Sequence, residues 1–360
     1  MILMDVIEQE KKTLSYTQPC QIVSLLPSHK TVKQEGIEPG DFLDLINSST
    51  VTWIDYATTD VEHDLETKAA QVGFSNALVS SLKGSYCSAY EDLGSELGIK
   101  LPAVKVKQFN VTMNPLIILI REGLILTVHN VEVLRLRIFS KYAETFFKKI
   151  SFEAPITDRL SIVLSRIIDE NNNANFDHLR QIEEQGDELS KELMDTDIPP
   201  KRLGPHIYEM KHALIAYLNA LWATLDVLNN IRYGDAELLT DDPKILQHYT
   251  ILVTDVNQQI SLAEHLSDVL ASGLEVLQSI YNNQLQALNN RMALVTAYLT
   301  ILGTAALVPN TIATIMGNSA FQMRPNDIGW YIVLLAGSTL VATYASYRWA
   351  KKRGLLPKII

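Results

Sequence analysis

The strongest pattern along the chain is a pair of long apolar runs near its C-terminal end. No charged residue lies between Arg291 and Arg324, and none lies between Asp327 and Arg348. A helix of about 20 apolar residues is long enough to cross the hydrocarbon of a bilayer. The two runs therefore predict two membrane-spanning helices joined by a short external loop. The predicted first span, loop and second span are residues 292–316, 317–327 and 328–347.

The first predicted span carries a stripe of small and polar residues. Steps of three or four residues, which bring side chains to one helix face, connect Ala293, Thr296, Thr300, Gly303, Leu307, Thr311, Thr314 and Asn318. Two interpretations stay open. Small residues and threonines let helices pack closely, or the stripe lines a water-filled path. In such a path Leu307 would be a hydrophobic constriction, whereas its alternative role is ordinary packing against the next helix.

The helical pattern of the first span begins much earlier in the chain. Apolar residues recur in steps of three and four from Ile245 to Leu288, with Pro243 at the start and no further proline before Pro309. This spacing predicts one helix from about residue 244 to residue 316, roughly 110 Å long at about 1.5 Å per residue. A helix of that length is rarely stable alone, so we expect a bundle of identical stalks.

The first part of the chain shows short β-rich runs alternating with helical ones, which is typical of an α/β domain. The predicted strands are Gln21–Leu26, Val51–Tyr56, Val104–Val111, Leu116–Ile120 and Leu124–His129. Helices are predicted from a cap at Thr59 or Asp60 to about Gly73, and over Asn76–Leu82. His129, inside a predicted strand, is expected to be a packed or hydrogen-bonded residue rather than a ligand.

After about residue 137 the pattern is helical throughout. The predicted helices are Leu136–Ile150, Ile156–Thr196 and His206–Tyr233, with breaks at Pro199-Pro200 and Gly204-Pro205. The asparagines at 171–173 and 175 are poor helix formers, and we expect them on an exposed face or a frayed turn. The predicted regions are an α/β domain, a helical region, a stalk and a basic tail, at residues 1–135, 136–242, 243–291 and 348–360, with the spans and loop between the last two.

Charge orients these regions. The tail contains five basic residues and no acidic one, whereas the loop contains only Arg324 and Asp327. By the positive-inside rule both termini are cytoplasmic and the loop is external, which predicts a multi-pass protein of the cell (inner) membrane. The net charge of −10 argues against binding nucleic acid. Neither span contains an acidic, basic or histidine residue, so passive flow down the membrane potential is favoured over proton coupling.

No enzyme signature is present: the chain has no glycine-rich phosphate loop, no His-Glu-x-x-His and no nucleophile elbow. The two cysteines, Cys20 and Cys87, have no metal-ligand spacing. The sequence thus predicts an α+β/α membrane protein that is not an enzyme.

Several motifs resemble the CorA family of divalent-cation transporters. Trp53-Ile54-Asp55 is similar to the family's Trp-Ile/Val-Asp strand, and Leu126-Thr127-Val128-His129 to its Leu-Ile-Thr-Val-His strand. The run Thr311–Gly317 resembles the residues before its Gly-Met-Asn signature. Here Asn318 follows Gly317 directly, which is a departure from that signature.

The resemblance implies a homopentameric funnel for Mg²⁺, with Co²⁺ and Ni²⁺ as further candidates. Asn318 from each subunit would form a carboxamide ring at the outer pore mouth that holds the hydrated ion, although Gly317-Asn318 is also a common helix stop. Thr314, Thr311, Thr300, Thr296 and Gly303 would line the path below it.

The resemblance also implies that cytoplasmic Mg²⁺ closes the pore. The candidate ligands on the stalk are Asp255, Glu264 and Asp268, and the alternative is a solvated stalk face. Where the family has Leu-Glu-Asp, this chain has Val79-Ser80-Ser81. Two rival functions remain open: a Zn²⁺ transporter of the same superfamily, and a non-conducting two-span scaffold or sensor.

Overall fold

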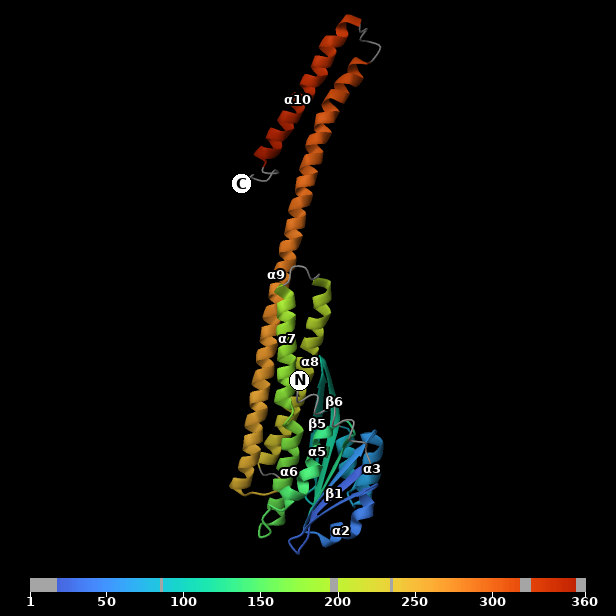
Figure 1. The fold of residues 1–360 in the computed structure, drawn as a ribbon, viewed down its shortest axis with the longest axis vertical. Coiled ribbons are helices and arrows are strands. Elements are labelled where there is room, and N and C mark those ends of the chain that lie inside the picture. The colour runs from blue at the N-terminus through green and yellow to red at the C-terminus, as the bar shows by residue number, and fades with distance from the viewer. Residues whose placement is uncertain (1–17, 85–86, 195–199, 234–235, 318–324, 354–360) are drawn as a thin grey trace. The chain divides into compact units, whose positions relative to one another are not determined.

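The computed structural model describes residues 18–84, 87–194, 200–233, 236–317 and 325–353. The chain divides into two compact units, Met1–Gly273 and Leu274–Ile360 (Figure 1). The helix α9, Pro243–Met316, has residues in both units.

The first unit contains a seven-stranded sheet with the strand order β2-β1-β3-β7-β6-β5-β4. Only the pair β3 and β7 is parallel, and the other neighbours are antiparallel. The strands are β1 Cys20–Leu25, β2 Thr31–Gly36, β3 Val51–Thr58, β4 Ala89–Asp92, β5 Glu96–Lys107, β6 Asn110–Arg121 and β7 Leu124–Asn130. Every residue of β3 is buried, because this strand is central and both faces of the sheet are covered.

The short helices α3, Val61–Gln71, and α4, Asn76–Lys83, pack on one face of the sheet. Ile54 of β3 points into the apolar core on this side together with Leu65 and Leu78. Asp60 caps α3 by accepting a hydrogen bond from the backbone N–H of His63 at 3.1 Å, as the sequence predicts. Ahead of β3 lie the 3-10 helix η1, Pro39–Phe42, and α2, Leu43–Ser48.

Longer helices cover the opposite face (Figure 1). They are α5 Leu134–Phe147, α6 Ile156–Asn172, α7 Asn175–Met194 and α8 Pro200–Arg232. Trp53, one residue before Ile54, points to this side, where its ring lies 4.8 Å from that of Phe139 on α5. The alternation of neighbouring β3 residues between the two faces is the period-2 pattern of a strand.

One strand prediction requires correction, and two strands were missed. The range Val104–Val111 is not one strand, because β5 and β6 form a hairpin whose turn is at Gln108 and Phe109. Gln108 adopts a φ of 55°, a left-handed conformation that the sequence pattern did not indicate. The edge strands β2 and β4 were also not predicted.

The helical region differs from the prediction at its asparagine-rich segment and at Pro205. The predicted helix Ile156–Thr196 is two helices, and Asn171, Asn172 and Asn175 at their junction are buried rather than exposed. Two of these side chains find partners there: the Asn171 amide donates to the carbonyl of Pro102 at 3.1 Å, and the Asn175 amide to Gln259 at 3.1 Å. Pro205 lies inside α8 rather than at a break, so packing along the rest of α8 outweighs the local cost of proline.

The second unit is a helical hairpin. It consists of the later part of α9, the 3-10 helix η2 at Pro325–Asp327, and α10 at Ile328–Lys352. As predicted, the stalk and first-span residues belong to one continuous helix.

Candidate ion-conduction pathway

In the described part of the chain, α9 and α10 are the two helices long and apolar enough to cross a membrane. Only 6 % of the apolar window of α9, and 0 % of that of α10, is buried. The apolar core helix of a soluble protein would be mostly buried. The exposed apolar surface of these helices therefore needs lipid or other helices around it, which supports the two predicted spans.

The predicted stripe on α9, called the polar stripe below, is open to its surroundings. Its exposed members are Ala293, Thr296, Thr300, Leu307, Thr311 and Thr314. Gly303 is half-buried, and a Cβ atom added to it would meet nothing within 4 Å. Within its own unit, α10 thus leaves this face of α9 uncovered.

The four exposed threonines of the stripe satisfy their hydroxyl protons within their own helix. Each donates to the backbone carbonyl four residues earlier, at distances of 2.7–2.9 Å. The hydroxyl oxygens keep their acceptor lone pairs. Water molecules around a cation point their hydrogens outward, so this row of acceptors suits a hydrated cation.

The C-terminal end of the stripe is described only as far as Gly317. Its N–H donates to the carbonyl of Ala313 at 2.9 Å, and an added Cβ would lie 3.1 Å from that oxygen. Glycine therefore fits this final turn better than a larger residue. Asn318, the residue predicted to form the carboxamide ring, lies outside the described residues. Leu307, the predicted constriction, is 62 % exposed, so its own subunit does not pack it away.

Aromatic and basic residues mark the two ends of α10. Trp330 and Trp349 are both exposed, about 28 Å apart along a helix rising about 1.5 Å per residue. Arg348, Lys351 and Lys352 surround Trp349, and no acidic residue lies among them. Tryptophan at both ends and cations at one end are typical of a helix that spans a bilayer.

The three acidic residues proposed as regulatory ligands are not assembled into a site in the single chain. Glu264 and Asp268 are exposed on α9, whereas Asp255 is half-buried. Among the described residues, no group of three or more His, Cys, Asp or Glu side chains is placed to hold a metal ion. Asp255 instead lies near Asp169 of α6, where burial first, and then the charges of Glu170 and Asp255, raise the pKa of Asp169 despite its ion pair with Arg166.

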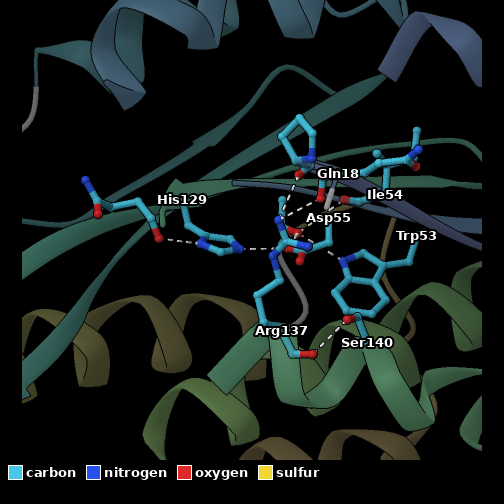
Figure 2. A network of polar contacts seen from close by, with 10 residues as sticks. Gln18, Trp53, Ile54, Asp55, His129, Arg137 and Ser140 are labelled. Atoms are coloured by element: carbon cyan, nitrogen blue, oxygen red, sulfur yellow. Dashed lines mark hydrogen bonds and ion pairs between the residues drawn. The ribbon is translucent and has the colours of Figure 1, made fainter. Parts of the chain in front are cut away.

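A buried ionic network occupies the sheet face that is covered by α5 (Figure 2). Asp55 of β3 accepts hydrogen bonds through Oδ1 from the Thr127 hydroxyl at 2.8 Å and from His129 Nε2 at 2.9 Å. The other ring nitrogen of His129 lies 2.8 Å from the carbonyl oxygen of Asn130, which can only accept. With an ionised Asp55, both nitrogens of His129 must donate, so the geometry fits an imidazolium–carboxylate pair.

Arg137 of α5 completes this network. Its guanidinium donates to the carbonyls of Gln18 and Pro19 at 3.0 and 3.4 Å, which fixes the start of β1. Burial alone would raise the pKa of Asp55, but the charge and hydrogen bond of His129, the hydrogen bond from Thr127 and the charge of Arg137 outweigh it and lower that pKa. His129 is thus a hydrogen-bonded residue of the sheet, as predicted. Both of its ring nitrogens have protein partners.

The fold and these helices define a two-span membrane protein with an α/β domain ahead of the spans. A family model described as "CorA-like Mg2+ transporter protein" matches residues 48–352. Because this match covers most of the chain, the protein belongs to the CorA-like Mg²⁺ transporter family. The comparison with curated proteins finds no match.

Solved structures show the same fold at low sequence identity. The CorA magnesium transporter from Methanocaldococcus jannaschii is 19 % identical, with a TM-score of 0.64 over 91 % of this chain and 96 % of that chain. The full-length CmaX protein is 14 % identical, with a TM-score of 0.58 over 94 % and 99 %. The ZntB cytoplasmic domain from Vibrio parahaemolyticus is 13 % identical, with a TM-score of 0.54 over 73 % and 98 %.

Proposed function

We propose that this chain forms a homo-oligomeric transporter for divalent cations, with Mg²⁺ as its main cargo and Co²⁺ and Ni²⁺ as further candidates. The observation that carries the proposal is the polar stripe of α9. It lies on an apolar helix, its threonines bond within that helix, and α10 leaves it exposed. Copies of α9 around a common axis would turn these stripes toward one another and enclose a water-filled path.

The assembly we propose is a pentamer, with α10 of each subunit on the lipid side and both termini in the cytoplasm. Family membership supports an assembly of identical subunits, and the length of α9 gives a physical reason, since a helix of this length needs neighbours. The basic end of α10 supports the orientation, because cytoplasmic flanks of spans are enriched in Lys and Arg.

Selection and driving force follow from the chemistry of the cargo. Mg²⁺ holds its waters tightly, so a ring of Asn318 carboxamides would select the hydrated ion by accepting hydrogen bonds from those waters. The membrane potential contributes about 2.3 kcal/mol per charge per 100 mV, and about twice that for a divalent cation. Asp255, Glu264 and Asp268 would bind cytoplasmic Mg²⁺ between subunits and close the path.

Metal uptake by liposomes containing the purified protein tests this function. We expect Mg²⁺ uptake that an inside-negative potential accelerates and that Asn318→Ala reduces. Asn326→Ala, the same change at an exposed asparagine near the end of the predicted loop, serves as the control. Uptake untouched by Asn318→Ala would refute the carboxamide ring.

The same assay separates the rival functions. Zn²⁺ uptake that exceeds Mg²⁺ uptake and rises with an imposed pH gradient would favour a zinc transporter. The Zn²⁺ assay is included because the chain shares its fold with the ZntB domain. No flux of any divalent cation would favour a scaffold or sensor.

A further inference from the structure

Most serine and threonine hydroxyl groups in the described part of the helical hairpin bond within their own helix. On α9 this holds for the four threonines of the polar stripe. On α10, Ser338, Thr339 and Thr343 donate to carbonyls three or four residues earlier, at 2.7–2.8 Å. Such local bonds satisfy a hydroxyl proton without help from another helix.

Ser346 departs from this pattern. Its hydroxyl donates across to Thr304 Oγ1 on α9 at 2.8 Å, instead of to its own helix. The Thr304 hydroxyl in turn donates to the carbonyl of Thr300 at 2.7 Å. A continuous chain of hydrogen bonds therefore runs from α10 through Thr304 to the backbone of a polar-stripe residue, and successive bonds in such a chain strengthen one another.

Small residues accompany this contact. Ala297, two turns before Thr304, is 7 % exposed, and Ala350, one turn after Ser346, is 3 % exposed. They are the two buried residues in the described part of the hairpin. Small residues at a helix contact let the two backbones approach closely. The covered side of α9 thus includes Ala297 and Thr304, and the exposed polar stripe lies beside it.

We propose that the hydrogen bond between Ser346 and Thr304 fixes the rotation of α9 about its own axis, so that both are positioning residues for ion conduction. The proposal rests on the proposed function. Apolar helices in lipid have no hydrophobic reason to prefer one rotation, so packing of small residues and polar contacts decide it. A rotation by one residue position, about 100°, would replace stripe residues such as Leu307 by Val308 in the path.

The contact itself is tested by cross-linking, independently of transport. In a chain with Cys20→Ala and Cys87→Ala, the pair Thr304→Cys and Ser346→Cys should form a disulfide within one subunit in membranes under mild oxidation. The matched pair Thr300→Cys and Ser346→Cys should not. Cyanogen bromide cleaves at Met316 and Met323, so the two helices stay together without reductant only where the disulfide has formed. Equal cross-linking of both pairs would overturn the proposal.

The rotation is tested by labelling with a membrane-impermeant thiol reagent in the cysteine-free chain. We expect Thr300→Cys to react and Val308→Cys to be protected. Adding Thr304→Val should make the two cysteines react more equally with the reagent. Adding Thr304→Ser should preserve the difference in their labelling. Thr343→Val is the control, because Thr343 donates to Thr339 in its own helix. If Thr304→Val leaves the difference in labelling between the two cysteines unchanged, Thr304 has no positioning role.

Transport separates positioning from folding. Per assembled oligomer, Thr304→Val should lower the maximal Mg²⁺ flux about threefold, the factor expected for an average interhelical hydrogen bond in a membrane protein. The half-saturating Mg²⁺ concentration should not change, since Thr304 does not line the path. Thr304→Ser should restore the flux, and an equal loss from Thr343→Val would overturn the proposal. A disulfide without labelling of either Thr300→Cys or Val308→Cys would confirm the contact between α9 and α10. The same result would refute the water-filled path of the proposed function.

Discussion

The α/β domain and the helical hairpin use polar side chains in opposite ways. In the sheet, Asp55 and His129 are 1 % and 0 % exposed, and each of them is bonded to residues distant in sequence (Figure 2). On α9, Thr300 and Thr311 are exposed, and each is bonded only four residues away in its own helix.

This contrast distinguishes polar residues that stabilise the fold from polar residues that are available to a ligand or to another subunit. A buried charge is costly unless it is paired, and Thr127 and His129 supply that pairing to Oδ1 of Asp55. A polar row on an exposed apolar helix has no such explanation within one chain, because its protons are already satisfied locally. Its remaining acceptors need water or another subunit.

Asp55→Ala should destabilise the α/β domain by about 3–5 kcal/mol, because it leaves His129 buried without its carboxylate partner and removes the negative charge near Arg137. Urea unfolding of the purified protein in detergent would measure this. Asp44→Ala is the matched control, since Asp44 is exposed on α2, and it should change stability by less than about 0.5 kcal/mol. Similar losses from both variants would contradict a structural role for the network.

The same network should make stability depend on pH on the acid side. Because the pKa of Asp55 is lower in the folded state, its contribution is present above the unfolded-state value of about 3.9 and is lost as pH falls through the lower folded-state pKa. Asn at this position does not titrate. The stability difference between the natural chain and Asp55→Asn should therefore narrow progressively below about pH 4. A difference that stays constant would argue against an ionised Asp55.

How far the sequence predicts the molecule depends on the distance between interacting residues. The long helix and the polar stripe follow from residues three or four positions apart. The helix appears in the structure as predicted, and the stripe residues as far as Thr314 lie along it. The pairs Asp55–His129, Arg137–Gln18 and Ser346–Thr304 join residues 74, 119 and 42 positions apart, and no local pattern reveals them.

The errors have physical causes of the same kind. Asn171 and Asn175 looked exposed because amides are poor helix formers, but burial is decided by partners from β5 and α9 that only the fold supplies. The hairpin turn at Gln108 lacks the glycine or Asn-Gly that signals a turn, and its left-handed backbone is stabilised by the long pairing of β5 with β6.

Leu307→Ser tests whether the exposed stripe encloses water. If Leu307 narrows the path as an apolar constriction, a hydroxyl there should let water remain and raise Mg²⁺ flux. Removing an apolar side chain of this size changes local free energy by about 1.5–3 kcal/mol, so we expect an increase of about tenfold or more. Leu302→Ser, at an exposed position off the stripe, is the control for liposome flux. An equal increase from both would count against a constriction.

Tyr217→Phe should cost about 1 kcal/mol in the first unit. The Tyr217 hydroxyl of α8 donates to the side-chain oxygen of Asn175 on α7 at 2.8 Å, and Asn175 donates on to Gln259 of α9. Phenylalanine keeps the packing and removes one buried hydrogen bond. The urea midpoint should fall, while Tyr208→Phe, at an exposed position of the same helix, should leave it unchanged. Equal midpoints would mean that this buried network contributes nothing measurable.

The smallest effect concerns the exposed acids of α9. Glu264 and Asp268 lie four residues apart, so their like charges repel by a few tenths of a kcal/mol. The double variant Glu264→Gln and Asp268→Asn should therefore be slightly more stable than the natural chain without metal.

Mg²⁺ at a concentration near its dissociation constant raises the free energy of unfolding of the protein that binds it by about 0.4 kcal/mol. If these acids are regulatory ligands, adding Mg²⁺ should remove the variant's advantage in a thermal unfolding series. Asp226→Asn, an exposed acid on α8, should show neither effect. An advantage that persists at all Mg²⁺ concentrations would assign Glu264 and Asp268 to a solvated face instead.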